Sequence, residues 1–278
     1  MKIVLSKYIG PCFGVVGAID EVFSKKEKIK IFGEIAHNEH IVNKISKMKN
    51  VTIVNNSDEV NEKETVIIRT HGIPIDDFVK LKNKKAKIID KTCPNVKFVH
   101  KISEKCSLEK NFLIIVGDSK HPEVVGIKSR CKNSVVINRL DDVNRLTFNK
   151  NLKNIVVSQT TFNYEKFNEI CSLLTKKINN IKCYNTICKD AINRRDEIFK
   201  NSNKFDVILV VGSKKSSNSV KLFDFAKCFN NKVEMISNIT DIDSNMFKNV
   251  NSVFITSGSS VMKETINEVV ETIKNIIC

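Results

Sequence analysis

The feature that most constrains the fold is a regular alternation of short β-branched runs with helical patterns. Alternating strands and helices predict an α/β fold with mainly parallel sheets. The candidate strands are Ile3–Leu5, Ile29–Phe32, Val51–Val54, Val66–Arg69, Lys87–Ile89, Phe112–Val116, Val135–Ile137, Ile155–Val157, Lys182–Tyr184, Val207–Val211, Val233–Ile236 and Val253–Thr256. Amphipathic patterns lie between many of them. The clearest covers 162–178 and places Phe167, Ile170, Leu174 and Ile178 on one face, and the last covers 261–277.

The number of strands sets the domain organisation. Twelve strands are too many for one compact sheet with helices this short, and the chain has no linker rich in Gly or Pro. The thirds share no obvious sequence identity, but each carries about four strands and one distinctive cysteine. We therefore predict three small α/β units packed around a common centre. They are residues 13–95, 96–188 and 189–278, the last completed by the N-terminal strand within 1–12.

The N-terminal segment and the apolar content point to a cytoplasmic protein. The chain is 41% hydrophobic, and no window approaches the 18 apolar residues that a membrane span needs. The sequence Gly10-Pro11-Cys12-Phe13-Gly14 follows the first strand too early for a signal peptide. We therefore expect no membrane partner.

The charge balance is strongly basic, with 46 Lys and Arg against 31 Asp and Glu and a net charge of +15. The excess is spread along the whole chain, which fits either a solvated surface or attraction to an anionic substrate or acidic protein. There is no basic tail, and three Tyr with no Trp offer few stacking groups. We therefore do not expect nucleic acid as a partner.

Cysteine, histidine and hydroxyl residues gather directly after the predicted strands. In open α/β sheets, ligands bind beyond the carboxyl ends of the strands. A core would instead place apolar residues at such positions. The strand-end groups are Cys12, His71-Gly72, Cys93-Pro94, His121-Pro122-Glu123, Gln159-Thr160-Thr161, Ser216-Ser217-Asn218 and Ser257-Gly258-Ser259-Ser260.

Nine cysteines without a C-x-x-C spacing argue against a disulfide framework or a local metal site. Cys12, Cys93 and Cys188 each lie in a predicted turn and could hold three irons of a 4Fe–4S cluster, leaving the fourth iron open. Each could equally be a small buried side chain. For the remaining six we expect packing roles for Cys106, Cys171 and Cys228, peripheral positions for Cys131 and Cys278, and a strand position for Cys183.

Histidines and hydroxyl loops suggest an anion site. His37, His71 and His121 each follow a predicted strand, whereas His100 lies within a helical pattern. The loops 213–219 and 257–260 can cradle phosphate at a helix N-terminus, or simply cap a helix. Glu123 could donate a proton to a substrate, or could only favour a helix start.

Nine motifs in order resemble those of the 4-hydroxy-3-methylbut-2-enyl diphosphate reductases, the IspH or LytB family. The similarity spans nearly the whole chain. The motifs are Gly10-Pro11-Cys12-Phe13-Gly14-Val15, His37-Asn38, Thr70-His71-Gly72, Asp90-Lys91-Thr92-Cys93-Pro94, Gly117–Val124, Ser158-Gln159-Thr160-Thr161, Thr186-Ile187-Cys188, Val211–Ser219 and Thr256–Ser260.

The resemblance implies a pseudo-threefold trefoil of α/β units around a central 4Fe–4S cluster with Cys12, Cys93 and Cys188 as its ligands. It implies reductive dehydroxylation of the allylic diphosphate to isopentenyl and dimethylallyl diphosphate, the last step of the non-mevalonate pathway. Ferredoxin or flavodoxin would supply the electrons. Glu123, Thr160 and His121 would be catalytic, and the substrate would be bound by His37, His71, His121, Thr160, Ser216, Ser217, Asn218 and Ser260.

The segment after Cys188 departs from the family pattern. The family usually has a small residue and Thr there, followed by Arg-Gln, whereas this chain has Asp190-Ala191 and Arg194-Arg195. Two alternatives stay open, another three-cysteine cluster enzyme such as a quinolinate synthase-like protein and a basic nucleotide- or RNA-binding protein. Radical S-adenosylmethionine chemistry is excluded because C-x-x-x-C-x-x-C is missing.

Overall fold

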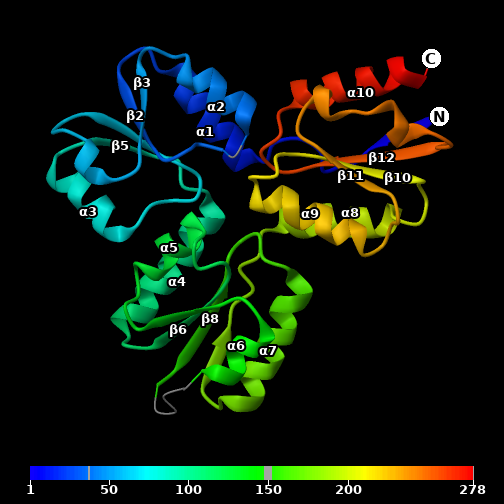
Figure 1. Ribbon diagram of the computed structural model, residues 1–278. Helices are drawn as coiled ribbons and strands as arrows, with labels where there is room; N and C mark the ends of the chain where they lie inside the picture. Colours follow the sequence, from blue (N-terminus) through cyan, green and yellow to red (C-terminus); the bar gives the residue numbers. More distant parts are fainter. Residues whose placement is uncertain (37, 147–151, 278) are drawn as a thin grey trace. The chain divides into compact units, whose positions relative to one another are not determined.

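The computed structural model describes residues 1–36, 38–146 and 152–277 (Figure 1). Within them, all twelve predicted strands are present, with ends that shift by at most one residue. The strands are β1 Lys2–Leu5, β2 Ile29–Phe32, β3 Val51–Val54, β4 Thr65–Ile68, β5 Lys87–Asp90, β6 Phe112–Val116, β7 Ser134–Ile137, β8 Asn154–Ser158, β9 Ile181–Cys183, β10 Val207–Val211, β11 Val233–Ile236 and β12 Ser252–Ser257.

Helices connect most of the strands, so the α/β prediction is confirmed. The helices are α1 Phe13–Ser24, α2 Glu39–Ser46, α3 Ile75–Asn83, α4 Pro94–Leu108, α5 Pro122–Lys128, α6 Leu140–Arg145, α7 Tyr164–Lys177, α8 Lys189–Asn201, α9 Ser217–Lys227 and α10 Lys263–Ile277. Helix α7 begins later than the apolar pattern suggests because Asn163 caps it, its side chain accepting the Lys166 amide at 2.7 Å. The predicted apolar face of α7 is buried.

The described strands form three four-stranded sheets in which every pair is parallel. Their strand orders are β1-β12-β10-β11, β5-β4-β2-β3 and β9-β8-β6-β7. In these orders, the strand at each position of one sheet corresponds to the strand at the same position of the other two sheets. Each sheet has its most buried strands in the middle, and β1, β5 and β9 occupy the same edge.

Both faces of the β10 sheet are covered by helices, as parallel sheets require. Val207, Leu209 and Val211 pack with residues of α10 on one face. Ile208 and Val210 pack with α8 and α9 on the other face (Figure 1). The middle strand is therefore continuously apolar, as its sequence indicates. In the same way, apolar residues of α4 and α5 pack on the β6 sheet, and apolar residues of α3 pack on the β4 sheet.

The chain divides into two compact units. One contains residues 1–16, 36–47 and 189–278 and includes the β10 sheet. The other contains residues 17–35 and 48–188 and includes the β2 and β6 sheets. The predicted boundaries of three units, after residues 95 and 188, stay a prediction.

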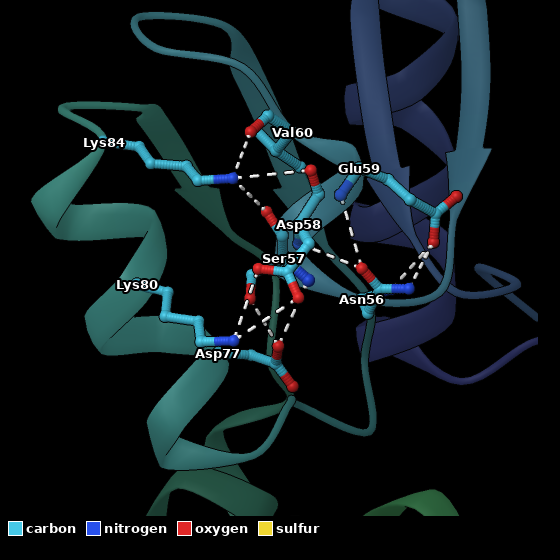
Figure 2. Close-up of polar contacts among 8 residues, drawn as sticks. All are labelled: Asn56, Ser57, Asp58, Glu59, Val60, Asp77, Lys80 and Lys84. Carbon is cyan, nitrogen blue, oxygen red and sulfur yellow. Dashed lines mark hydrogen bonds and ion pairs between the residues drawn. The ribbon is translucent and has the colours of Figure 1, made fainter.

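The connection from β3 to β4 is fixed on α3 by polar contacts around a 3₁₀ turn, Ser57–Glu59 (Figure 2). Asp77 of α3 accepts the Ser57 hydroxyl at 2.6 Å and the Ser57 amide at 3.1 Å. Lys84 donates to the carbonyls of Ser57 and Val60 at 2.8 and 2.7 Å. These bonds, together with Val60 buried in the apolar core beside β4 and α3, hold the connection in place.

Two of the cysteine predictions are wrong. Cys131, expected at the periphery, is fully buried in the core shared by α4, α5 and the β6 sheet. Cys228, expected to pack, is exposed because it stands at the C-terminal cap of α9. Cys106 is buried as predicted, and Cys183 ends β9. Cys278 lies outside the described residues.

Across the residues that the structure describes, no helix has the length and apolar character needed to cross a bilayer.

Candidate active site

A glycine stands directly after the same strand of each sheet. Gly33, Gly117 and Gly212 follow β2, β6 and β10, and each donates its amide to the last carbonyl of the neighbouring outer strand. The bonds join Gly33 to Val54 at 2.7 Å, Gly117 to Ile137 at 2.8 Å and Gly212 to Ile236 at 2.8 Å. The three loops that follow therefore start from equivalent backbone positions.

This equivalence aligns three of the predicted substrate-binding residues. Counting four residues from each glycine gives His37, His121 and Ser216. The internal repeat is hidden in the sequence because only the glycine is identical in the three loops. His37 itself lies outside the described residues, so its predicted position is not addressed by the structure.

The three predicted cluster ligands also occupy equivalent positions. Cys12, Cys93 and Cys188 follow the edge strands β1, β5 and β9, and each immediately precedes a helix. Each cysteine amide donates to the carbonyl of the second residue after the adjacent strand. The acceptors are Ser259 for Cys12 at 3.0 Å, Thr70 for Cys93 at 3.0 Å and Thr160 for Cys188 at 2.8 Å.

This setting suits thiolate ligands, because the positive end of a helix favours a negative sulfur. All three side chains are half-buried. Burial raises the pKa of the Cys12 thiol, while the amides of Val15 and Gly14 act in the opposite direction. A bound cation would overcome the cost of burying this thiolate.

Cys188 receives an additional donor that the sequence did not suggest. The side-chain amide of Asn95, in the first turn of α4, donates to its sulfur at 3.2 Å. Amide donors to sulfur are typical of iron–sulfur ligation. The chemistry of these half-buried thiols therefore fits an iron–sulfur cluster. The described residues contain no preformed group of three His, Cys, Asp or Glu side chains suited to a metal ion, so the three-cysteine ligand set stays a prediction.

Glu123 and Thr160 are in direct contact. Glu123 is only 1% exposed, although it begins helix α5. The Thr160 amide donates to Glu123 Oε1 at 2.6 Å and the Thr160 hydroxyl to Oε2 at 2.9 Å. A carboxyl group that only favoured a helix start would be solvated, so its burial supports a chemical role.

The imidazoles of His71 and His121 lie together. Their ring centroids are 5.2 Å apart and the rings meet edge to face at 87°. His121 caps α5, its Nδ1 accepting the Glu123 amide at 3.2 Å. The neutral His121 ring therefore carries its proton on Nε2, where it can be donated to an anion.

The hydroxyl loops of the other unit are joined to each other. Ser216 caps α9 by accepting the Ser219 amide at 3.4 Å. Of the two roles expected for this loop, helix capping is therefore present. Asn218 donates to the Ser259 hydroxyl at 3.1 Å, and Asn38 donates to the Ser260 carbonyl at 2.8 Å. The two loops thus bring hydroxyl and amide groups together at the start of α9, a combination suited to phosphate.

Ser219 explains two glycines at these loops. Its side chain is fully buried, and a Cβ on Gly212 or Gly258 would lie 2.4 or 2.0 Å from its Oγ. Only glycine therefore allows both loops to close around this serine. In the sequence, nothing distinguishes Ser219 from its polar neighbours in the segment 213–219.

The predicted site residues thus fall into two groups. One unit holds Cys93, Cys188, His71, His121, Glu123 and Thr160. The other holds Cys12, Ser216, Ser217, Asn218 and Ser260.

Three parallel sheets with thiol, imidazole, carboxyl and hydroxyl groups at their strand ends define a class of three-sheet α/β enzymes. A family model described as LytB protein matches residues 3–274. This chain belongs to the LytB family, and the resemblance inferred from its motifs is confirmed.

Curated relatives match over their full length. The 4-hydroxy-3-methylbut-2-enyl diphosphate reductase of Campylobacter hominis is 36% identical over 282 residues, covering 100% of each chain. The enzyme of the same name from Alkaliphilus oremlandii is 34% identical, with 99% of this chain and 100% of that one covered.

Two solved structures share the fold. The E-1-hydroxy-2-methyl-but-2-enyl-4-diphosphate reductase of Plasmodium falciparum has a TM-score of 0.91 at 28% identity, covering 97% of this chain and 87% of that one. A structure of (E)-4-hydroxy-3-methyl-but-2-enyl diphosphate reductase, the terminal enzyme of the non-mevalonate pathway, has a TM-score of 0.72 at 30% identity and covers 99% and 100%.

Proposed function

We propose that this chain is an iron–sulfur 4-hydroxy-3-methylbut-2-enyl diphosphate reductase. It removes the allylic hydroxyl as water with two electrons and two protons, giving isopentenyl and dimethylallyl diphosphate. The observation that carries the proposal is the repeated position of Cys12, Cys93 and Cys188, each before a helix and each bonded to the neighbouring strand-end loop. Family membership agrees with it.

The three cysteines would hold a 4Fe–4S cluster, which when bound supplies electrons and an open iron for the substrate oxygen. A small acidic electron carrier, ferredoxin or flavodoxin, would deliver the electrons, and the net charge of +15 favours its encounter with this chain. The 4Fe–4S type of the cluster and the identity of the electron donor are both part of the proposed function.

The diphosphate would be bound by neutral donors rather than by a clamp of lysines. His71 and His121 would donate from their rings, and His37 would join them. Ser216, Ser217, Asn218 and Ser260 would donate from the joined loops at the start of α9. Amides at a helix N-terminus add to the attraction for the anion.

Glu123 would supply the proton that lets hydroxide leave as water. A protonated Glu123 would donate to the Thr160 hydroxyl, whose own proton would then point to the substrate oxygen. In the structure the Thr160 hydroxyl donates to Glu123 Oε2 at 2.9 Å, so this bond would reverse its direction when Glu123 is protonated. The burial of Glu123 limits its contact with bulk water, as a proton donor in a closed site requires.

The test is anaerobic purification followed by turnover with a chemical reductant. We expect brown protein that converts the allylic alcohol diphosphate to both isomeric products, detected by mass spectrometry. Protein that stays colourless after reconstitution with iron and sulfide would contradict the proposal. Coloured protein without turnover would point to a different cluster enzyme.

A further inference from the structure

Arg194 of α8 bridges two loops of the unit that contains the β10 sheet. Its side chain is 2% exposed. The guanidinium donates from Nη1 to the Ser257 carbonyl at 3.0 Å and from Nη2 to the Gly10 carbonyl at 2.9 Å. One loop leads to Cys12, and the other is the hydroxyl loop after β12. A single buried cation therefore contacts both.

Asp190 holds this guanidinium in place from one turn earlier on the same helix. Its Oδ2 accepts Arg194 Nε at 2.8 Å and its Oδ1 accepts Nη2 at 3.3 Å. A buried cation is costly unless it is paired and its donors are satisfied.

The two loops also bond to each other directly. The Gly10 amide donates to Ser257 Oγ at 2.8 Å, and the Cys12 amide donates to the Ser259 carbonyl at 3.0 Å. Gly10 has a φ of +90°, a conformation that favours glycine. Arg194 contacts the carbonyl of Gly10, two residues before Cys12, and that of Ser257, where the hydroxyl loop begins, so it fixes the geometry in which these two bonds form.

The same helix holds the earlier part of the Cys12 loop through a different residue. Glu197 accepts the Ser6 hydroxyl at 2.5 Å and the amides of Lys7 and Tyr8 at 2.8 and 3.2 Å. Helix α8 thus anchors the segment after β1 twice, first with a carboxylate and then with a guanidinium. The second anchor lies next to the predicted ligand.

We propose that Arg194, held by Asp190, is a positioning residue that fixes the Cys12 loop against the Ser257–Ser260 loop. The pair would set the place of one cluster ligand relative to the loop that receives the diphosphate. This role in placing a cluster ligand rests on the proposed function of both loops. The contacts of Arg194 with the two loops, which we call the Arg194 clamp, can be tested in the protein without a cluster.

The experiment is hydrogen exchange of the apoprotein, followed by mass spectrometry of peptides covering residues 6–13. Arg194→Lys keeps the charge, but one ammonium group cannot replace the fork of donors. Arg130→Lys is the matched control. Arg130 is also a buried arginine, with 7% exposure, and it pairs with Glu104 at 3.2 Å and donates to the Ile73 carbonyl at 3.0 Å.

We expect exchange of the Gly10 and Cys12 amides to accelerate about tenfold or more in Arg194→Lys. The Lys7 and Tyr8 amides, held by Glu197, should keep their rates, and Arg130→Lys should leave all four unchanged. Unchanged rates at Gly10 and Cys12, or an equal rise in the control, would overturn the proposal. If Arg194→Lys folds poorly, Asp190→Asn should give a smaller rise at the same two amides, and no rise would be equally contrary.

The outcome is separable from that of the proposed function. A colourless protein with the predicted exchange pattern would contradict the proposed cluster and would support the Arg194 clamp. A brown protein with unchanged exchange would do the reverse. As a second measurement, a chelator should remove iron from the reconstituted Arg194→Lys protein several-fold faster than from the Arg130→Lys protein.

Discussion

Both carboxylate oxygens of Glu123 accept hydrogen bonds from one residue, Thr160, whose amide lies 2.6 Å from Oε1 and whose hydroxyl lies 2.9 Å from Oε2. Glu123→Gln keeps the shape of this contact but removes the acidic proton. General acids contribute about 100- to 10,000-fold. We therefore expect the Gln variant to bind its cluster and substrate but to turn over at least about 100-fold more slowly with a chemical reductant.

The control for this variant is Glu165→Gln, since Glu165 also lies in the first turn of a helix, α7. If Glu123 only favoured a helix start, both variants would lose about 0.3–1 kcal/mol of stability and keep near-normal rates. Normal turnover in Glu123→Gln would leave His121 or a substrate phosphate as the proton source.

The second prediction concerns the diphosphate. Asn218 donates to Ser259 across the two hydroxyl loops and is half-buried. Removing a hydrogen bond to a charged group costs about 1.5–3 kcal/mol. Asn218→Ala should therefore weaken substrate binding roughly tenfold or more, measured by calorimetry in the slow Glu123→Gln background. Asn201→Ala, on α8, should bind normally, and equal binding by both would place the anion elsewhere.

The third prediction concerns the sulfur of Cys188. A donor to a ligating sulfur stabilises the reduced, more negative cluster. Asn95→Ala removes the 3.2 Å contact from the side-chain amide. A hydrogen bond worth about 0.5–1.5 kcal/mol corresponds to roughly 20–65 mV for one electron. The midpoint potential should fall by that amount in a spectroscopic titration. A potential that stays or rises would show that this donor does not act on the cluster.

The fourth prediction concerns pH and His100. Burial lowers the pKa of His100 to about 3, with the Arg130 charge acting in the same direction. The unfolded chain binds a proton near pH 6.5, but the folded chain does not, so stability rises with pH between about 3 and 6.5. This one group adds a slope of up to about 1.4 kcal/mol per pH unit. Denaturant unfolding of His100→Asn should show a flatter profile, and an unchanged slope would be contrary.

The central strands were predictable because they are short apolar runs, rich in β-branched residues and buried on both faces, as in Val207–Val211. The structural repeat of the loops was harder to predict. Their repeat depends on backbone bonds, such as that from Gly117 to Ile137, while the side chains after each glycine differ. Sequence identity between the thirds is therefore too low to show the repeat.

The candidate site was predictable where a residue type is unusual at a strand end, as at Glu123. The contacts of Asn95 and Arg194 were not predicted because a helical Asn or Arg resembles an ordinary surface residue. One signal for Arg194 was available, since Asp190 precedes it by four residues and such pairs meet on a helix. Cys131 was misplaced because it follows a short helix, although its thiol turns into the core.

The central claim is that Cys12, Cys93 and Cys188 bind the cluster, and iron content tests it most directly. Iron per chain should be measured after anaerobic purification of the three Cys→Ser variants, with Cys106→Ser and Cys171→Ser as controls. The account predicts that each of the three loses most of its iron while the controls retain it. Full iron content in Cys188→Ser would contradict it and make Cys183, five residues earlier, the candidate ligand.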